Sequence, residues 1–284
     1  MLPEWLTITP ATTAEYGKIK EAVATLGTRT VCIDAHCPNM AECWSSGTAT
    51  FMILGGTCTR GCRFCAVGKS ARGDAVDALE PAKIAKAVKE WKLGYVVLTS
   101  VCRDDLPDQG ASHFAACIKG IKTVNPNVKV ELLIPDFGGD AKLLQAVIDA
   151  QPDVIGHNIE TVGRLSSGIR DRRASYAQSL GVLKKAKKLG KNFYTKSAMM
   201  LGLGETEDEV IRALKDLRSV GVDFVAIGQY LRPSKSQIEV HEYITPAAFE
   251  RIRKKALGMG FLHVAAGPFV RSSYRAGGYF ARPQ

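Results

Sequence analysis

Residues 51–67 read FMILGGTCTRGCRFCAV, an apolar run that passes directly into three closely spaced cysteines. The run Phe51–Leu54 predicts a buried strand, and Cys58, Cys62 and Cys65 follow it with C-x3-C-x2-C spacing. Because α/β proteins bind ligands at the carboxyl ends of parallel strands, we expect this cysteine loop at that edge of a sheet.

The spacing of these thiols limits what they can bind. Three thiolates so close in sequence can converge only if the loop wraps around one centre, and soft thiolates select zinc or an iron–sulfur cluster. Zinc favours a tetrahedral site closed by a fourth nearby ligand. A cubane can be held by three cysteines, with one iron left open to bind a further molecule. The spacing therefore favours the cluster over a structural zinc site.

A second group of three cysteines lies upstream in VCIDAHCPNMAECW, where Cys32, Cys37 and Cys43 form a C-x4-C-x5-C pattern. Taken alone, this wider spacing also fits a structural zinc site with His36 as its fourth ligand. Two cysteines remain, and one of them, Cys117 in HFAACIKG, fits a small core residue in a helix.

After residue 50 the chain alternates β-branched apolar runs with helical patterns. The predicted strands are Phe51–Leu54, Tyr95–Thr99, Val128–Ile134, Val154–Ile159, Asn192–Ala198 and Asp223–Gly228. The predicted helices are Pro81–Trp91, Ala111–Val124, Ala141–Ala150, Tyr176–Leu189, Glu207–Val220 and Pro246–Leu257. Strands that alternate with helices indicate an α/β fold with a parallel sheet, which both a doubly wound sheet and a barrel satisfy. No GxGxxG motif opens a helix after a strand, which argues against a doubly wound sheet of the dinucleotide-binding kind.

The pattern divides the chain into three parts. Residues 1–50 lack the alternation and form an extension, helical around Ala14–Leu26. Residues 51–266 carry the strands and helices, and residues 267–284 form an irregular tail.

Composition excludes several classes of protein. The 284 residues are 46% hydrophobic and 23% charged, which fits one large folded domain rather than a disordered chain. No run of about 18 apolar residues predicts a membrane span. The first residues, MLPEWLTITP, do not resemble a secretory or transit signal, so we expect a cytoplasmic chain whose cysteines serve metal or redox chemistry.

The formal charge of +10 indicates an acidic partner. The basic residues gather in two helical stretches, one with Lys184, Lys185, Lys187, Lys188 and Lys191, the other with Arg251, Arg253, Lys254 and Lys255. Such runs are usually solvated helix faces. Aromatic residues do not interleave with them, so a stacking platform for nucleic acid is not indicated.

The cysteine motifs and several later segments carry a family resemblance. The C-x3-C-x2-C of Cys58, Cys62 and Cys65 resembles the defining motif of radical S-adenosylmethionine (SAM) enzymes. The preceding triad with CPNMAECW resembles lipoyl synthases in particular. Further matches are TSVCRDDLPDQGA, HNIETV, KSAMMLGLGET, GQYLRPS and GPFVRSSY, so the resemblance covers residues 28–275. One departure is Cys102, where the family usually has an acidic residue. Cys102 follows the second predicted strand and could line the site, but we expect a packing role for it.

The resemblance implies a partial (β/α)6 barrel of radical SAM type with two [4Fe–4S] clusters. Cys58, Cys62 and Cys65 would hold the cluster that binds and cleaves SAM. Cys32, Cys37 and Cys43 would hold an auxiliary cluster, with Ser273 of RSSY as its fourth ligand. An oxygen donor binds iron weakly, which suits a cluster that must be opened.

The resemblance also implies the reaction: two sulfur atoms are inserted at C6 and C8 of an octanoyl chain on a carrier-protein lysine. Each insertion consumes one SAM, and the auxiliary cluster supplies the sulfur. The implied partners are octanoylated lipoyl domains of 2-oxoacid dehydrogenase acyltransferase subunits, glycine-cleavage H protein, a ferredoxin or flavodoxin, and an iron–sulfur cluster carrier. No nucleic acid or membrane is implied, and a monomer is expected.

Polar residues at the ends of the predicted strands are candidate SAM contacts, because carboxylates and amides can meet ribose hydroxyls and cations can meet a carboxylate. They are Thr99, Ser100, Asn158, Glu160, Lys196 and Arg232.

Three other functions compete with this interpretation. A radical SAM methylthiotransferase acting on RNA would use the basic charge, but such enzymes usually carry their additional cluster in a separate domain. An iron–sulfur electron carrier would not need six βα units, and a zinc-binding interaction module would bind zinc rather than iron.

Overall fold

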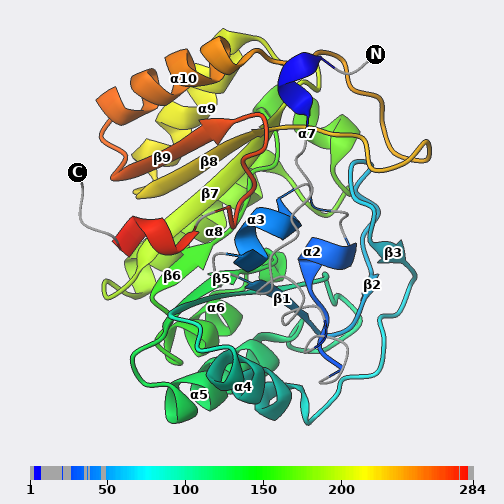
Figure 1. Cartoon of the computed structure of the whole chain (residues 1–284), viewed down its shortest axis with the longest axis vertical. Helices are drawn as coiled ribbons and strands as arrows, with labels where there is room; N and C mark the ends of the chain where they lie inside the picture. The colour runs from blue at the N-terminus through cyan, green and yellow to red at the C-terminus, as the bar shows by residue number, and fades with distance from the viewer. Residues whose placement is uncertain are drawn as a thin grey trace. The chain divides into compact units, whose positions relative to one another are not determined.

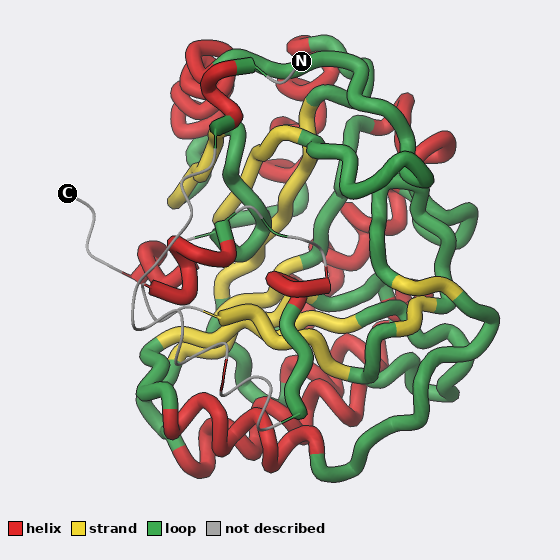
Figure 2. Tube along the Cα trace, turned by 45° about the vertical axis from the view of Figure 1, so that its right-hand side comes forward, coloured by secondary structure: helices red, strands yellow, loops and turns green. Residues whose placement is uncertain are grey.

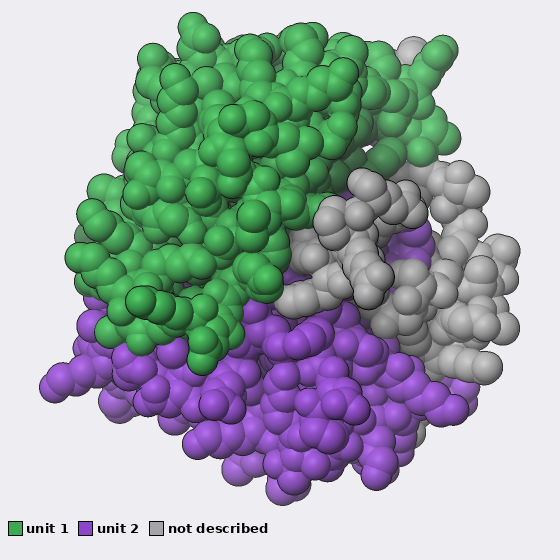
Figure 3. Space-filling view, turned by 90° about the vertical axis from the view of Figure 1, so that its left-hand side faces the viewer, with its two compact units in different colours: residues 1–8, 61–66, 155–272 green, residues 9–60, 67–154, 273–284 purple. Residues whose placement is uncertain are grey.

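The computed structural model describes residues 3–7, 21, 27–34, 37, 39–45, 49–274 and 276–280. The chain divides into two compact units, shown in different colours in Figure 3. Unit 1 comprises Met1–Ile8, Gly61–Ala66 and Ile155–Ser272. Unit 2 comprises Thr9–Arg60, Val67–Val154 and Ser273–Gln284.

Unit 2 contains three parallel strands in the order β1–β4–β5, labelled in Figure 1. They span Ala49–Ile53, Tyr95–Ser100 and Lys129–Leu133, and Phe51 pairs with Leu98, which pairs with Leu132. Helices α4 (Glu80–Glu90), α5 (Ala111–Val124) and α6 (Ala141–Ile148) follow these strands. Their apolar faces recur at helical spacing and are buried, as Ile84 and Val88 of α4 show. A small parallel pair, β2 (Thr57–Cys58) and β3 (Gly68–Lys69), carries the first cysteine of the loop.

Two short helices precede β1, namely α2 (Val31–Asp34) and α3 (Met40–Ser45). The extension is attached to β1, since the N–H of Met52 donates to the carbonyl of Arg29 at 2.9 Å and Thr30 bridges Phe51. The 3-10 helix η3 (Ala276–Phe280) near the end of the chain buries Ala276 against Tyr95 and Val97.

Unit 1 contains the parallel strands β6 (Val154–Gly156), β7 (Tyr194–Leu201), β8 (Phe224–Gln229) and β9 (His263–Gly267) in chain order. The helices are α7 (Gly163–Ile169), α8 (Tyr176–Leu189), α9 (Glu207–Ser219) and α10 (Pro246–Gly258), and the 3-10 helix η1 spans Glu4–Leu6. Figure 1 shows α9 and α10 packed on one face of β8 and β9. Their contact buries side chains such as Leu214 and Phe249 against Ile227.

Local sequence explains where the helices of unit 1 begin. Ser175 and Thr245 cap α8 and α10 by accepting from the N–H of Gln178 and Ala248. Thr206 forms a complete capping box with Glu209 at the start of α9.

The α/β class and the six predicted strands are confirmed, and Figure 2 shows the strands and helices together along the chain trace. After residue 50, the sequence prediction missed the two-residue strands β2 and β3, the strand β9 and the short helix α7. In β9, HVAAG has few β-branched residues, and its strand conformation comes from pairing with β8. The helix predicted around Ala14–Leu26 falls on residues that, apart from Glu21, lie outside those described. No helix in the described ranges is long and apolar enough to cross a membrane.

Candidate functional site

Cys58 ends β2 in unit 2, and its sulfur is surrounded by hydrogen-bond donors. The backbone N–H groups of Arg60 and Cys102 each lie 3.4 Å from Cys58 Sγ. The hydrogen bond from the Cys102 thiol lowers the pKa of Cys58 to about 6, although burial acts in the opposite direction. The thiolate is the form that ligates metals, so this surrounding favours the ligating state.

Cys62 and Cys65 belong to unit 1, where the segment after α7 holds their loop. The N–H of Asp171 donates to Cys62 Sγ at 3.3 Å, and the carboxylate of Asp171 accepts from the N–H of Gly61 at 2.7 Å. The N–H of Arg63 donates to the carbonyl of Ile169 at 2.8 Å. Backbone donors aimed at sulfur stabilise a ligating thiolate, so Asp171 both positions the loop and supports Cys62.

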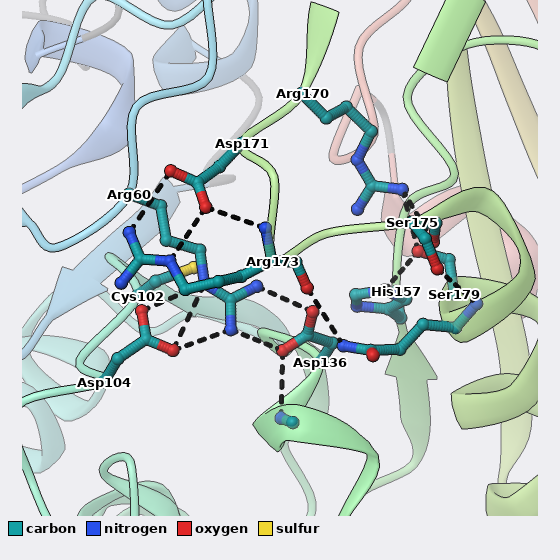
Figure 4. Close-up of polar contacts among 12 residues, drawn as sticks. Arg60, Cys102, Asp104, Asp136, His157, Arg170, Asp171, Arg173, Ser175 and Ser179 are labelled. Carbon is teal, nitrogen blue, oxygen red and sulfur yellow. Dashed lines mark hydrogen bonds and ion pairs between the residues drawn. The ribbon is translucent and has the colours of Figure 1, made fainter. Parts of the chain in front are cut away.

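Arg60, between the first two cysteines, is fixed by two carboxylates (Figure 4). Its guanidinium lies 2.7 Å from Asp104 and 2.6 Å from Asp136, and its side chain is 5% exposed. Burial lowers the pKa of Arg60, but the hydrogen bonds to Asp104 and Asp136 outweigh this and raise it above its ordinary value. Thr59 Oγ1 donates to the same Asp104 at 2.7 Å. These contacts hold the chain beside Cys58 in one geometry.

Sequence reasoning missed this network. Asp104 was visible in the TSVCRDDL match, and Asp136 follows the predicted third strand, where chemistry-bearing residues of parallel sheets gather. Neither residue's pairing with Arg60 could be derived from spacing.

The upstream cysteines gather in one apolar cluster of unit 2. Cys32 is buried and packs with Cys37 and Cys43, together with Met40 and Trp91. None of these three described cysteines forms a disulfide. Within the described part of the chain, no three Cys, His, Asp or Glu side chains converge closely enough for a single metal ion, and His36 lies outside that part.

The RSSY segment reaches this cysteine cluster. Tyr274 donates from its hydroxyl to Glu42, with both carboxylate oxygens at 3.2 Å, and Glu42 is the chain neighbour of Cys43. Ser273, half-buried, directly precedes Tyr274 and opens the turn that leads to η3. The segment with the predicted fourth ligand is therefore held against the helix that carries Cys43.

The two candidate SAM contacts of unit 2 differ in what their hydroxyls do. Thr99 Oγ1 donates to the carbonyl of Leu133 at 3.1 Å, so the sheet already uses this group. Ser100 ends β4, and its buried hydroxyl oxygen finds no hydrogen-bond partner among the described residues. A buried hydroxyl without a partner is costly, which makes Ser100 the stronger candidate for a ligand contact.

In unit 1, Asn158 and Glu160 follow β6 and share a side-chain hydrogen bond. Burial raises the pKa of Glu160, while Arg170 and Asn158 oppose the shift. Glu160 also has a φ of 66°, a left-handed conformation that non-glycine residues seldom adopt. Its backbone bridges Met199 of β7, which keeps it at a strand end.

The other two candidates of unit 1 have different surroundings. Lys196 lies within β7 and is 1% exposed. Arg232 donates to the carbonyls of Gln237 at 2.8 Å and Lys235 at 2.6 Å, so it mainly closes its own loop. Figure 4 also shows Arg170 and His157, which both contact the Ser179 hydroxyl at 2.9 Å and thereby fix the segment that leads to Asp171.

Comparison with known proteins gives consistent results. The Radical SAM superfamily model matches residues 52–217. A lipoyl synthase of Methanocella arvoryzae is 51% identical over 97% of this chain and 93% of the relative. A lipoyl synthase of Pyrobaculum calidifontis is 54% identical over 97% of this chain and 94% of the relative. The mitochondrial lipoyl synthase of Vitis vinifera is 50% identical over 99% of this chain and 73% of the relative.

Solved structures support the fold. The FeFe-hydrogenase maturase HydG from Carboxydothermus hydrogenoformans matches with a TM-score of 0.58 and 14% identity, over 89% of this chain and 72% of that one. Methylornithine synthase (PylB) matches with a TM-score of 0.58 and 14% identity, over 77% of this chain and 70% of that one. At this identity the likeness shows the fold alone, which agrees with the α/β class predicted from the sequence.

Proposed function

Since the chain belongs to the lipoyl synthase family of radical SAM enzymes, we propose that it inserts sulfur at C6 and C8 of an octanoyl-lysine carried by a protein. That it is an enzyme that inserts sulfur follows from the family. What we propose beyond this is that the sulfur atoms enter at C6 and C8 of the octanoyl chain, and which residues of this chain take part. The observation that supports it most is the near-complete match to lipoyl synthases, which includes both cysteine triads and the RSSY segment.

The radical SAM family implies one [4Fe–4S] cluster and SAM. We assign Cys58, Cys62 and Cys65 as its ligands, because N–H groups point at the sulfurs of Cys58 and Cys62. When bound, this cluster supplies the electron that cleaves SAM and so starts hydrogen abstraction from an unactivated C–H bond. Arg60 and Asp171 act on the protein side by holding the cysteine loop in a fixed geometry.

The auxiliary [4Fe–4S] cluster is a substrate in this proposal, because it gives up the sulfur. Cys32, Cys37 and Cys43 would hold it, with Ser273 as an oxygen ligand to the fourth iron. The contact of Tyr274 with Glu42 supports this assignment, since it ties the serine segment to the cysteine cluster. A serine ligand leaves iron more readily than a thiolate, which suits a cluster that is consumed.

SAM binding involves polar groups at strand ends, and two SAM molecules are used for each lipoyl group. Ser100 offers an unpartnered hydroxyl, and the Asn158–Glu160 pair offers an acceptor and a donor for ribose hydroxyls. The other three candidates are held by the protein itself. The hydroxyl of Thr99 and the guanidinium of Arg232 donate to backbone carbonyls, and Lys196 is buried within β7. We therefore propose that they shape the site rather than contact SAM directly.

The charge of the chain supports an acidic protein partner. In α10, Arg251 and Lys255 pair with Glu207, and Arg253 and Lys254 pair with Glu250, so two carboxylates offset part of the charge of these four cations. In α8, Lys187 pairs with Asp223. The formal charge of +10 fits an acidic carrier domain, and the lack of aromatic residues among the basic runs argues against a nucleic-acid track.

The partners proposed are octanoylated lipoyl domains of 2-oxoacid dehydrogenase acyltransferase subunits, the glycine-cleavage H protein, a ferredoxin or flavodoxin donor, and a cluster carrier. The enzyme would work as a monomer in the cytoplasm, where reduced thiols remain available to hold clusters.

An anaerobic assay with reductant, SAM and an octanoylated lipoyl domain tests the proposal. The expected product gains two sulfur atoms, and two molecules of 5′-deoxyadenosine form for each lipoyl group. SAM cleavage without sulfur insertion would point to another radical SAM activity. Methylthio groups appearing on RNA in place of this product would favour the methylthiotransferase alternative.

A further inference from the structure

Cys102 is a cysteine that neither of the two proposed cluster sites uses as a ligand. It follows β4, and its backbone N–H lies 3.4 Å from Cys58 Sγ. The thiols of the two residues also share a hydrogen bond. A fourth thiol in direct contact with one member of the C-x3-C-x2-C loop is therefore built into unit 2.

The main chain on both sides of this contact is held in register. The N–H of Thr59 donates to the carbonyl oxygen of Cys102 at 3.0 Å, and the hydroxyl oxygen of Thr59 lies 3.0 Å from the same carbonyl oxygen. The backbone N–H of Arg60 donates to Cys58 Sγ, and the guanidinium of Arg60 pairs with the carboxylate of Asp104. The backbone of Cys102 contacts the sulfur of Cys58, and these hydrogen bonds fix the main chain around both residues, which limits the movement needed to bridge them.

The two cysteines of this pair differ in burial from the core cysteine Cys117. Cys58 and Cys102 are both half-buried, whereas Cys117 is fully buried in the core. Within unit 1, the sulfur of Cys62 accepts from the N–H of Asp171 at 3.3 Å. Within unit 2, the contact of Cys102 with Cys58 supports a bridge between these two cysteines.

We propose that Cys58 and Cys102 form an oxidation site, at which a peroxide converts the cluster-free enzyme into a disulfide form that cannot accept the cluster. Cys58 reduces hydrogen peroxide to one water and becomes a sulfenic acid. The sulfur of Cys102 then attacks the sulfenic sulfur, the S–S bond forms and a second water leaves. The two thiols lose two protons and two electrons in total, and the peroxide gains them. A dithiol reductant reverses the modification by thiol–disulfide exchange.

The consequence for cluster loading rests on the proposed function, because it counts Cys58 as a ligand. A disulfide removes one of the three thiolates and closes the loop to iron. Once the cluster is bound, Cys58 is occupied and the bridge cannot form. The pair would thus keep an emptied site in a reversible oxidation state instead of allowing sulfinic or sulfonic acid to form.

The test uses the full-length chain without clusters, treated anaerobically with one equivalent of hydrogen peroxide. Remaining thiols are blocked with N-ethylmaleimide, and tandem mass spectrometry identifies the bridged peptides. The expected result is a Cys58–Cys102 cross-link that disappears after treatment with dithiothreitol. Bridging of Cys58 to Cys62, or of Cys62 to Cys65, as the main product would overturn the proposal.

Two variants and a loading measurement complete the test. In Cys102→Ser the cross-link is lost, and dimedone traps a sulfenic acid at Cys58; in Cys117→Ala, a matched control in the core, the cross-link persists. The oxidised chain takes up about half the iron of the reduced chain, because only one cysteine triad remains open. Full iron uptake despite a confirmed cross-link would refute the assignment of Cys58 as a ligand, whereas an absent cross-link refutes the oxidation site alone.

Discussion

The Arg60 network gives the sharpest stability prediction. In Arg60→Ala, Asp136 keeps a carboxylate that is 1% exposed but loses its guanidinium partner. Removing one member of a buried ion pair costs about 3–5 kcal/mol, because the remaining charge stays desolvated. The contribution of Asp104 is smaller, since its side chain is 23% exposed and water can replace part of the interaction. We therefore expect a loss of about 3–5 kcal/mol, nearly all of it from Asp136.

Equilibrium unfolding of the cluster-free chain in urea measures this loss, with circular dichroism and tryptophan fluorescence recorded together. Coincidence of the two signals allows one free energy of unfolding to be assigned. Arg173→Ala is the matched control, because Arg173 pairs with Asp171 but its side chain is 42% exposed, so it should cost no more than about 1 kcal/mol. The double variant Arg60→Met/Asp136→Asn should recover part of the loss, since no charge is then left buried at that position. An Arg60→Ala chain as stable as the control would refute the reasoning.

Three further outcomes can be checked. In Gly228→Ala, the new Cβ would lie 1.9 Å from the carbonyl oxygen of Val270, so we expect a loss of about 1–3 kcal/mol in urea unfolding; an unchanged midpoint would contradict the packing of β8. Ser273→Ala should lower lipoyl product more than 5′-deoxyadenosine in the anaerobic assay, and equal losses would argue against a role confined to the auxiliary cluster. Burial raises the pKa of Glu160 from 4.5, so the folded state holds that proton more tightly than the unfolded state does. The contribution of Glu160 to stability is present below pH 4.5 and is lost as the pH rises through the folded-state pKa. The wild-type chain should therefore lose stability relative to Glu160→Gln as the pH rises through that range. A difference in unfolding free energy between the two chains that does not change with pH would contradict the shift.

Local patterns account for much of the fold. Helices α5 and α8 span Ala111–Val124 and Tyr176–Leu189, the ranges that their apolar spacing predicts. By contrast, α7 has the sequence GRLSSGI, whose glycines and serines favour helix weakly, so its helix depends on surrounding contacts. The same holds for β9, whose pairing with β8 is not encoded in its own five residues.

The candidate site shows a similar division. The cysteine spacing was visible because the motif is contiguous. The partners of Arg60 were not, because Asp104 and Asp136 lie 44 and 76 residues further along the chain. The sequence could not distinguish the two neighbouring candidates Thr99 and Ser100. The hydroxyl of Thr99 donates to the carbonyl of Leu133, whereas the hydroxyl of Ser100 has no partner among the described residues. Only the folded backbone decides which polar atoms the protein uses for itself.

One measurement tests the central claim most directly. The chain is reconstituted with iron and 34S-labelled sulfide, freed of excess sulfide, and given SAM, reductant and an octanoylated lipoyl domain for a single turnover. The account predicts a lipoyl product that contains two 34S atoms, and no such product from Cys37→Ala, which lacks one auxiliary ligand. A product whose sulfur is unlabelled, or a labelled product of normal yield from Cys37→Ala, would contradict it.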